Sequence, residues 1–107
     1  MPKYYHFNYG LNNTGNYNFG WDAINHLSSV VITAAEGREL SENGVILRTT
    51  NSPERFIGNA QFSVHNVAPY DGGVGFRLEI DWPGLLNTWV CITVFDDSDY
   101  AGIGQNT

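Results

Sequence analysis

The residues in this chain that are best suited to ligand chemistry are aromatic rings beside short polar side chains. Trp21-Asp22 and Tyr70-Asp71 each place a ring next to a carboxylate, and an Asn precedes a Trp by two positions near residue 88. A flat ring packs against the apolar C–H face of a sugar, while carboxylates and amides bond its hydroxyl groups. The pattern predicts a non-catalytic, lectin-like site for a neutral, hydroxyl-rich ligand, in particular a carbohydrate, formed by Trp21, Asp22, Tyr70, Asp71, Asn87 and Trp89. For each ring taken singly, packing in a hydrophobic core is the competing interpretation.

A pair of carboxylates offers a second kind of chemistry. Glu79 and Asp81 alternate onto one face of an expected strand beside Arg77, roughly 7 Å apart by the rise of a strand. Glycosidases use two carboxyl groups roughly 5–10 Å apart as acid and base. An enzyme that uses Glu79, Asp81 or a histidine as general acid or base is therefore an alternative hypothesis. A solvated strand face with an Arg–Glu contact is the simpler interpretation of the same residues.

Neither a metal site nor a cofactor site is expected. The aspartates of the segment Asp96–Asp99 lack the glycine and the distal glutamate of the best-known calcium loop. Cys91 lies in a very apolar run, where a thiol is usually an inert filler, and no glycine-rich phosphate loop opens a helix. The histidines have no H-x-H or H-x-x-x-H spacing that would let two of them share a zinc ion; they are His6, His26 and His65.

Charge and composition exclude several partners. The formal net charge is −6, and the five Lys and Arg residues are scattered singly. A nucleic-acid backbone needs clustered cations, so no nucleic-acid partner is expected. No stretch approaches the ~18 apolar residues of a transmembrane segment. The single cysteine cannot form a disulfide within the chain, and no leader pattern opens it, so the expected location is the cytoplasm or, after removal of a leader, outside the cell.

Alternation of apolar and polar residues predicts an all-β protein. The run from Val74 to Trp82 alternates strictly, and the run from Trp89 to Phe95 is apolar on both sides, so the second should lie inside a sheet. Pro83-Gly84 is the turn between them. Further strands are expected at 4–9, 16–21, 29–34, 45–50 and 60–65. The fold predicted for residues 1–96 is a single antiparallel β-sandwich or small barrel of about seven strands, followed by a flexible acidic tail over residues 97–107.

The aromatic N-terminus predicts a hairpin and a possible subunit contact. Residues 4–9 and 16–21 alternate aromatic and polar side chains, and the Asn and Gly residues between them favour a tight turn. A third hypothesis is therefore an assembly module, in which the edge strand Tyr4–Tyr9 pairs with another subunit in a homo-oligomer.

One short motif resembles a known group of proteins. The pattern W-P-x-x-x-N-x-W at Trp82, Pro83, Asn87 and Trp89 follows G-V-G-F. It resembles a corner of the small acidic β-sandwich proteins of the aegerolysin and actinoporin-like groups, which bind membrane lipids or glycans. Their tyrosine-rich headgroup site and amphipathic N-terminal helix have no counterpart in this sequence. The resemblance implies membrane-lipid binding as an alternative to glycan binding.

Overall fold

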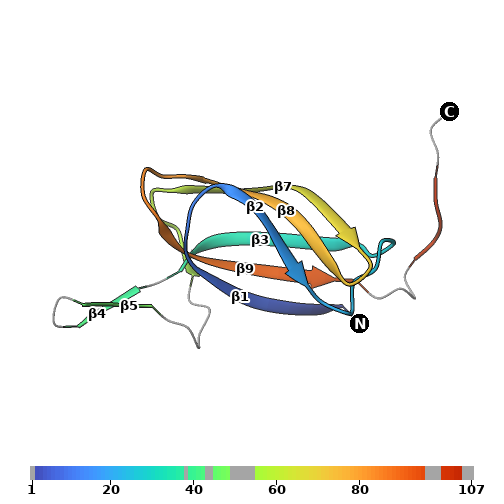
Figure 1. The fold of residues 1–107 in the computed structure, drawn as a ribbon, viewed down its shortest axis with the longest axis horizontal. Helices are drawn as coiled ribbons and strands as arrows, with labels where there is room; N and C mark the ends of the chain where they lie inside the picture. Colours follow the sequence, from blue (N-terminus) through green and yellow to red (C-terminus); the bar gives the residue numbers. More distant parts are fainter. Residues whose placement is uncertain (1, 38, 43–44, 49–54, 96–99, 105–107) are drawn as a thin grey trace.

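The regular elements of the protein are all strands (Figure 1). The computed structural model describes residues 2–37, 39–42, 45–48, 55–95 and 100–104, and no helix occurs in these ranges, including any that could cross a membrane. The all-β prediction is therefore confirmed. The strands are β1 (Lys3–Asn12), β2 (Gly15–Gly20), β3 (Val30–Gly37), β4 (Glu39–Glu42), β5 (Val45–Arg48), β6 (Arg55–Phe56), β7 (Gln61–Tyr70), β8 (Gly73–Asp81) and β9 (Leu86–Val94).

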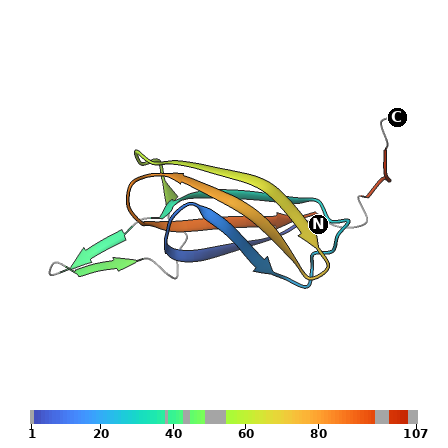
Figure 2. The same cartoon turned by 45° about the horizontal axis from the view of Figure 1, so that its top comes forward.

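Six of these strands form two antiparallel sheets that pack against each other (Figures 1 and 2). One sheet has the order β1-β9-β3, with the two-residue β6 paired to the end of β3, and the other has the order β2-β8-β7. The strands β4 and β5 pair only with each other, and their hairpin projects from one end of the sheets (Figure 1). The arrangement thus differs from the predicted seven strands, because the expected strand at 45–50 pairs locally in its hairpin instead of joining a sheet.

The hydrophobic core lies between the two central strands. Both sheets turn one face inward, and the side chains of that face alternate with solvent-facing ones as the strand period requires. The prediction that the run 89–95 lies inside a sheet is confirmed, since β9 is flanked by β1 and β3. The buried residues contributed by the central strands are Val74, Phe76, Leu78 and Ile80 of β8 and Val90, Ile92 and Val94 of β9.

The turn after β8 does not make the expected hairpin. Residues 82–85 carry the chain from one sheet to the other, so β8 and β9 face each other across the core instead of pairing. Trp82 N donates a hydrogen bond to Ile80 O at 3.0 Å, which turns the chain and ends the alternation at Asp81. The Trp82 side chain is consequently 40% exposed and does not continue the buried face of β8.

The predicted N-terminal hairpin is also wrong in its pairing. β1 pairs with β9 and β2 pairs with β8, so the connection between them crosses from sheet to sheet. The register of β1 shifts between Asn8 and Gly10, where Gly10 has φ 73°, and such a bulge bends a strand out of its sheet. The aromatic rings still meet, but across the two sheets: the ring centroids of Tyr9 and Tyr17 are 5.2 Å apart. Burial raises the pKa of Tyr9 to about 12.

The acidic tail falls largely outside the described residues. Of the range 97–107, the structure describes residues 100–104, which are exposed and have no regular structure. The predicted division at residue 96 therefore stays a prediction.

The position of Leu78 at the centre of β8 leads to a prediction about stability. Leu78 is fully buried, so Leu78→Ala should lower the free energy of unfolding by about 2–5 kcal/mol through lost burial and a residual cavity. Leu85→Ala is the matched control, because Leu85 is 57% exposed and should change stability by less than about 0.5 kcal/mol. Urea denaturation followed by circular dichroism measures both. Equal effects of the two substitutions would contradict the placement of the core.

Candidate functional site

The outer face of the β2-β8-β7 sheet carries a continuous set of polar side chains. Residues that are paired across two strands point to the same face of the sheet. The register therefore places all of these side chains on the face that is directed away from the core. The predicted solvent face of β8 is confirmed, and the neighbouring strands extend it on both sides. We call this surface the polar face; its side chains are those of Asn16, Asn18, Gln61, Ser63, His65, Tyr70, Arg77, Glu79 and Asp81.

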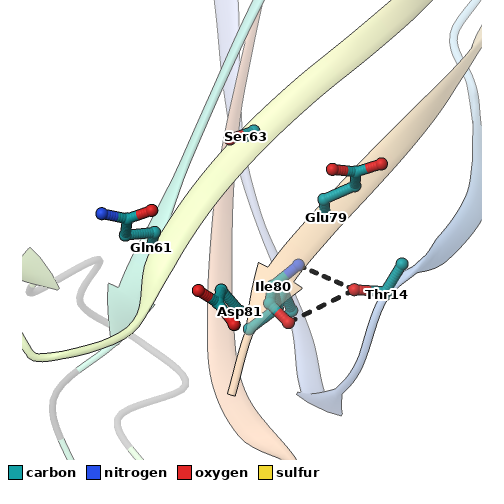
Figure 3. A pocket seen from close by; sticks show the side chains of 6 residues that line it. All are labelled: Thr14, Gln61, Ser63, Glu79, Ile80 and Asp81. Carbon is teal, nitrogen blue, oxygen red and sulfur yellow. Dashed lines mark hydrogen bonds between the residues drawn. The ribbon is translucent and has the colours of Figure 1, made fainter.

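A groove of about 360 Å³ opens at one end of the polar face (Figure 3). Thr14 closes one side of it, since Thr14 Oγ1 accepts a hydrogen bond from Ile80 N at 2.9 Å and donates one to Ile80 O at 3.3 Å. The hydroxyl therefore continues the contact between β2 and β8 beyond the last paired residue. The groove presents hydroxyl, amide and carboxylate groups from three segments, namely Thr14, Gln61, Ser63, Glu79 and Asp81, together with Ile80.

Charged contacts along the middle of the polar face hold Glu79 in place. Arg77 Nε donates to Glu79 Oε1 at 3.4 Å, and His65 Nε2 lies 3.6 Å from Glu79 Oε2. Arg77 Nη1 also donates to Asn16 Oδ1 at 3.3 Å, so one guanidinium links β8 to β2. The partners are about half exposed, and such surface pairs contribute at most about 1 kcal/mol each. Their main effect is to orient the carboxylate beside the groove.

The other end of the polar face carries an aromatic ring. The Tyr70 ring lies across the backbone of Gly73: a Cβ at Gly73 would be 2.6 Å from Tyr70 Oη and 2.8 Å from Cζ. Tyr70 Oη donates a hydrogen bond to Asn18 Oδ1 at 2.5 Å, which fixes the ring across the sheet. Tyr70 remains 41% exposed. A ring held in this way is a flat platform on which the C–H face of a sugar can pack.

Four of the six residues predicted for ligand binding gather at the Tyr70 end of the molecule. The connection after β2 rests on the β7–β8 turn, since Trp21 N donates to Gly72 O and Gly72 N donates to Ile24 O, both at 2.8 Å. Trp21 is half buried, with its ring centroid 5.4 Å from that of Tyr5. The polar partners that the sequence places beside the two rings, Asp22 and Asp71, are both exposed.

Asp71 is engaged by a histidine of the neighbouring loop. His26 N donates to Asp71 Oδ1 at 2.9 Å, and His26 Nδ1 lies 2.8 Å from the same oxygen. These hydrogen bonds hold the pKa of the Asp71 carboxyl below its usual value of 3.8. The carboxylate therefore joins the two loops through Oδ1.

The other two predicted residues lie at the opposite end of the molecule and are buried. Asn87 is 1% exposed and Trp89 is 4% exposed, on the outer side of the β1-β9-β3 sheet. Asn8 Nδ2 donates to Asn87 Oδ1 at 3.0 Å, and the backbone of Gly37 lies so close that a Cβ there would be 2.8 Å from Trp89 Nε1. The indole N–H has no hydrogen-bond partner among the described residues. The structure therefore does not bring these two residues to the first four.

Comparisons with protein-family models, curated proteins and solved structures found no match to this chain. Within the described ranges, no three His, Cys, Asp or Glu side chains are placed to share a metal ion. The polar face and its groove are therefore the basis of the proposed function. Sequence reasoning missed Asn16, Asn18, Gln61 and Ser63 of the polar face, although their alternation with apolar residues marks them as solvent-facing. It also missed Thr14, which lines the groove and which no alternation marks.

The contact between Tyr70 and Gly73 predicts the effect of a single methyl group. Gly73→Ala should displace the Tyr70 ring and crowd Phe19 O, 2.7 Å from the added Cβ, lowering the free energy of unfolding by about 1–3 kcal/mol. Gly75→Ala is the matched control on the same strand face, because its Cβ would meet only Tyr17 O at 3.9 Å. Urea denaturation measures the stability, and NMR of the Tyr70 ring protons reports the displacement. An unmoved ring in Gly73→Ala would contradict the described contact.

The bond between His26 and Asp71 predicts a pH dependence. Because the folded pKa of Asp71 is lowered, the contact stabilises the fold above pH 3.8, and this contribution disappears as the pH falls through the folded pKa. Asp71→Asn should therefore reduce the loss of melting temperature between about pH 5 and pH 2.5. Asp22→Asn removes a carboxylate from the same end without touching His26, and its melting profile should follow that of the wild type. Identical profiles for all three proteins would argue against the contact.

Proposed function

We propose that this chain is a small β-sandwich module that binds a neutral, hydroxyl-rich ligand, a carbohydrate, on the polar face without catalysing a reaction. The observation that carries the proposal is the groove of about 360 Å³ that continues into a polar strand face bearing the exposed Tyr70 ring. Sugar sites combine these two elements, a ring for the C–H face and convergent polar groups for the hydroxyls.

Each part of the polar face has a role in this proposal. Tyr70 stacks on one sugar unit, and the amide of Gln61 and the hydroxyl of Ser63 donate to and accept from ring hydroxyls in the groove. Asp81, which is paired with Gln61 across the sheet and lies on the Gln61 side of the groove in Figure 3, accepts hydroxyl protons. A net charge of −6 with few cations suits an uncharged ligand better than an anionic one. An open strand face of this kind favours contact along a chain of sugars over enclosure of a single small molecule.

The same groove favours one second candidate function. Glu79 and Asp81 line it together, so a hydrolase that uses them as acid and base has its two carboxyl groups on one surface. Glu79, however, already accepts contacts from Arg77 and His65, and exposed carboxylates held in this way are ready acceptors for ligand hydroxyls. Binding without turnover is for this reason our first proposal.

Substitution of Tyr70 tests the proposal. Binding to a glycan array, followed by calorimetry on the best glycan, should identify a ligand. Tyr70→Ala should raise the dissociation constant for this glycan about tenfold, the contribution expected of one aromatic contact. Tyr70→Phe keeps the ring and should bind within about threefold of wild type. Thr33→Ala, on the outer face of the other sheet, is the control for nonspecific loss, and circular dichroism confirms that each variant is folded.

Other outcomes distinguish the alternatives. An array without ligands would refute glycan binding. Release of sugar from a bound glycan, abolished by both Glu79→Gln and Asp81→Asn, would establish the hydrolase instead. Binding to neutral phospholipid vesicles that is lost in Trp82→Ala and kept in Tyr70→Ala would support the lipid-binding hypothesis, because Trp82 is exposed at the β8–β9 turn.

A further inference from the structure

The edge of the first strand is open. Within the described residues β1 pairs only with β9, so the backbone N–H and C=O groups on its other side have no strand partner. The segment Lys3–Asn8 keeps a regular register before the bulge near Gly10. A straight, unpaired edge of this length is a template for another strand.

The edges formed by β7 and β2 carry features that discourage pairing. β7 is interrupted by a register shift between His65 and Ala68, with Asn66 at φ 53°, and it contains Pro69, which has no N–H to donate. β6 covers only the last two residues of β3, Glu36 and Gly37, and β2 is only six residues long with glycine at both ends. β1 has a bulge of its own, but only beyond Asn8, so Lys3–Asn8 is a regular, proline-free stretch of open edge. Among the described edges, the uncovered part of β3, residues 30–35, is a comparable stretch, but it carries no aromatic side chain.

Aromatic side chains accompany this open edge. Tyr5 is 51% exposed and Phe7 is 39% exposed, although both lean toward Phe19 of the facing sheet, with ring centroids 5.6 Å and 5.3 Å away. Rings that are half covered in this way can bury their remaining surface against a second strand laid beside β1. The free edge and the exposed rings are independent observations that coincide on one side of the molecule.

The charge distribution indicates which partner fits. The first 21 residues contain no Asp or Glu, and Lys3 is their only Lys or Arg, so all 11 carboxylates of the chain lie beyond Trp21. Two copies of a chain with net charge −6 repel each other over most of their surfaces. At β1 they can approach without bringing carboxylates together.

We propose that a second copy of this chain pairs with it, β1 against β1, in an antiparallel fashion about a two-fold axis. The two sheets then join into one continuous sheet of the order β3-β9-β1-β1-β9-β3. Antiparallel pairing places Lys3 of each copy toward the far end of the other copy's strand, which keeps the two cations apart. It also lays Tyr5 and Phe7 of each copy beside the same two residues of the other copy. Because both copies use the same edge in a two-fold contact, the assembly stops at a dimer.

Molecular mass as a function of concentration tests the proposal. The monomer has a mass of 11.9 kDa, and light scattering and sedimentation should give twice this value for the wild type. Tyr5→Glu brings a carboxylate of each copy to the shared edge and should raise the dimer dissociation constant at least tenfold. Val31→Glu is the matched control, because Val31 is 48% exposed on β3 of the same sheet, away from the β1 edge, and this variant should remain dimeric.

Hydrogen exchange of the wild type keeps the test independent of whether Tyr5→Glu folds. Amides of Lys3–Asn8 should gain protection as the protein concentration rises, and amides of β7 should not. A monomer at every concentration, or protection that is independent of concentration, would overturn the proposal. Dissociation in Val31→Glu but not in Tyr5→Glu would overturn it as well, and so would open-ended species larger than a dimer.

Discussion

The packing of β8 against β9 is the contact on which the rest of this structure depends. Each is the central strand of a three-stranded sheet, and the apolar side chains of the two strands form most of the buried core. Because apolar burial is the dominant favourable term in folding, the outer strands gain their stability largely by pairing with these two. The strands β1 and β3 are held on β9, and β2 and β7 are held on β8. The polar face exists in its observed form only because β8 keeps β2 and β7 on its two sides.

The two sheets use their outer faces differently. The face of β2-β8-β7 carries the carboxylates, the amides and Arg77, with the Tyr70 ring at one end and a groove at the other. The outer face of β1-β9-β3 carries no Lys, Arg, Asp or Glu on these three described strands, and His6, Cys91 and Thr33 lie there in register. A module with one polar face and one open edge can hold a ligand and a second subunit without competition between them. The proposed glycan site and the proposed dimer therefore rest on different strands.

Side-chain alternation in the sequence predicts the faces of the strands well and their partners poorly. The period of two assigns Leu78 to the core and Glu79 to solvent, because neighbouring residues of a strand must point in opposite directions. It does not tell whether a short connection folds back within one sheet or crosses to the other, and both connections predicted as hairpins cross. In the candidate site, likewise, the sequence predicts some of the exposed residues but not which residues come together. Tyr70 lies on the polar face, whereas Trp89 is buried, with its indole ring close to the backbone of Gly37, a contact between strands that no local pattern encodes.

The pairing of the first strand with the last has a consequence for how the chain folds. Asn8 and Asn87 are hydrogen-bonded although 79 positions separate them, so the partner that β1 has among the described strands is synthesised long after β1 itself. Contacts of such long range require a costly loop closure and are formed slowly. Until β9 is made, both edges of an aromatic, nearly uncharged strand stay open. We therefore expect β1 to need shielding during synthesis, because an aromatic strand with two open edges can associate with other chains until β9 pairs with it.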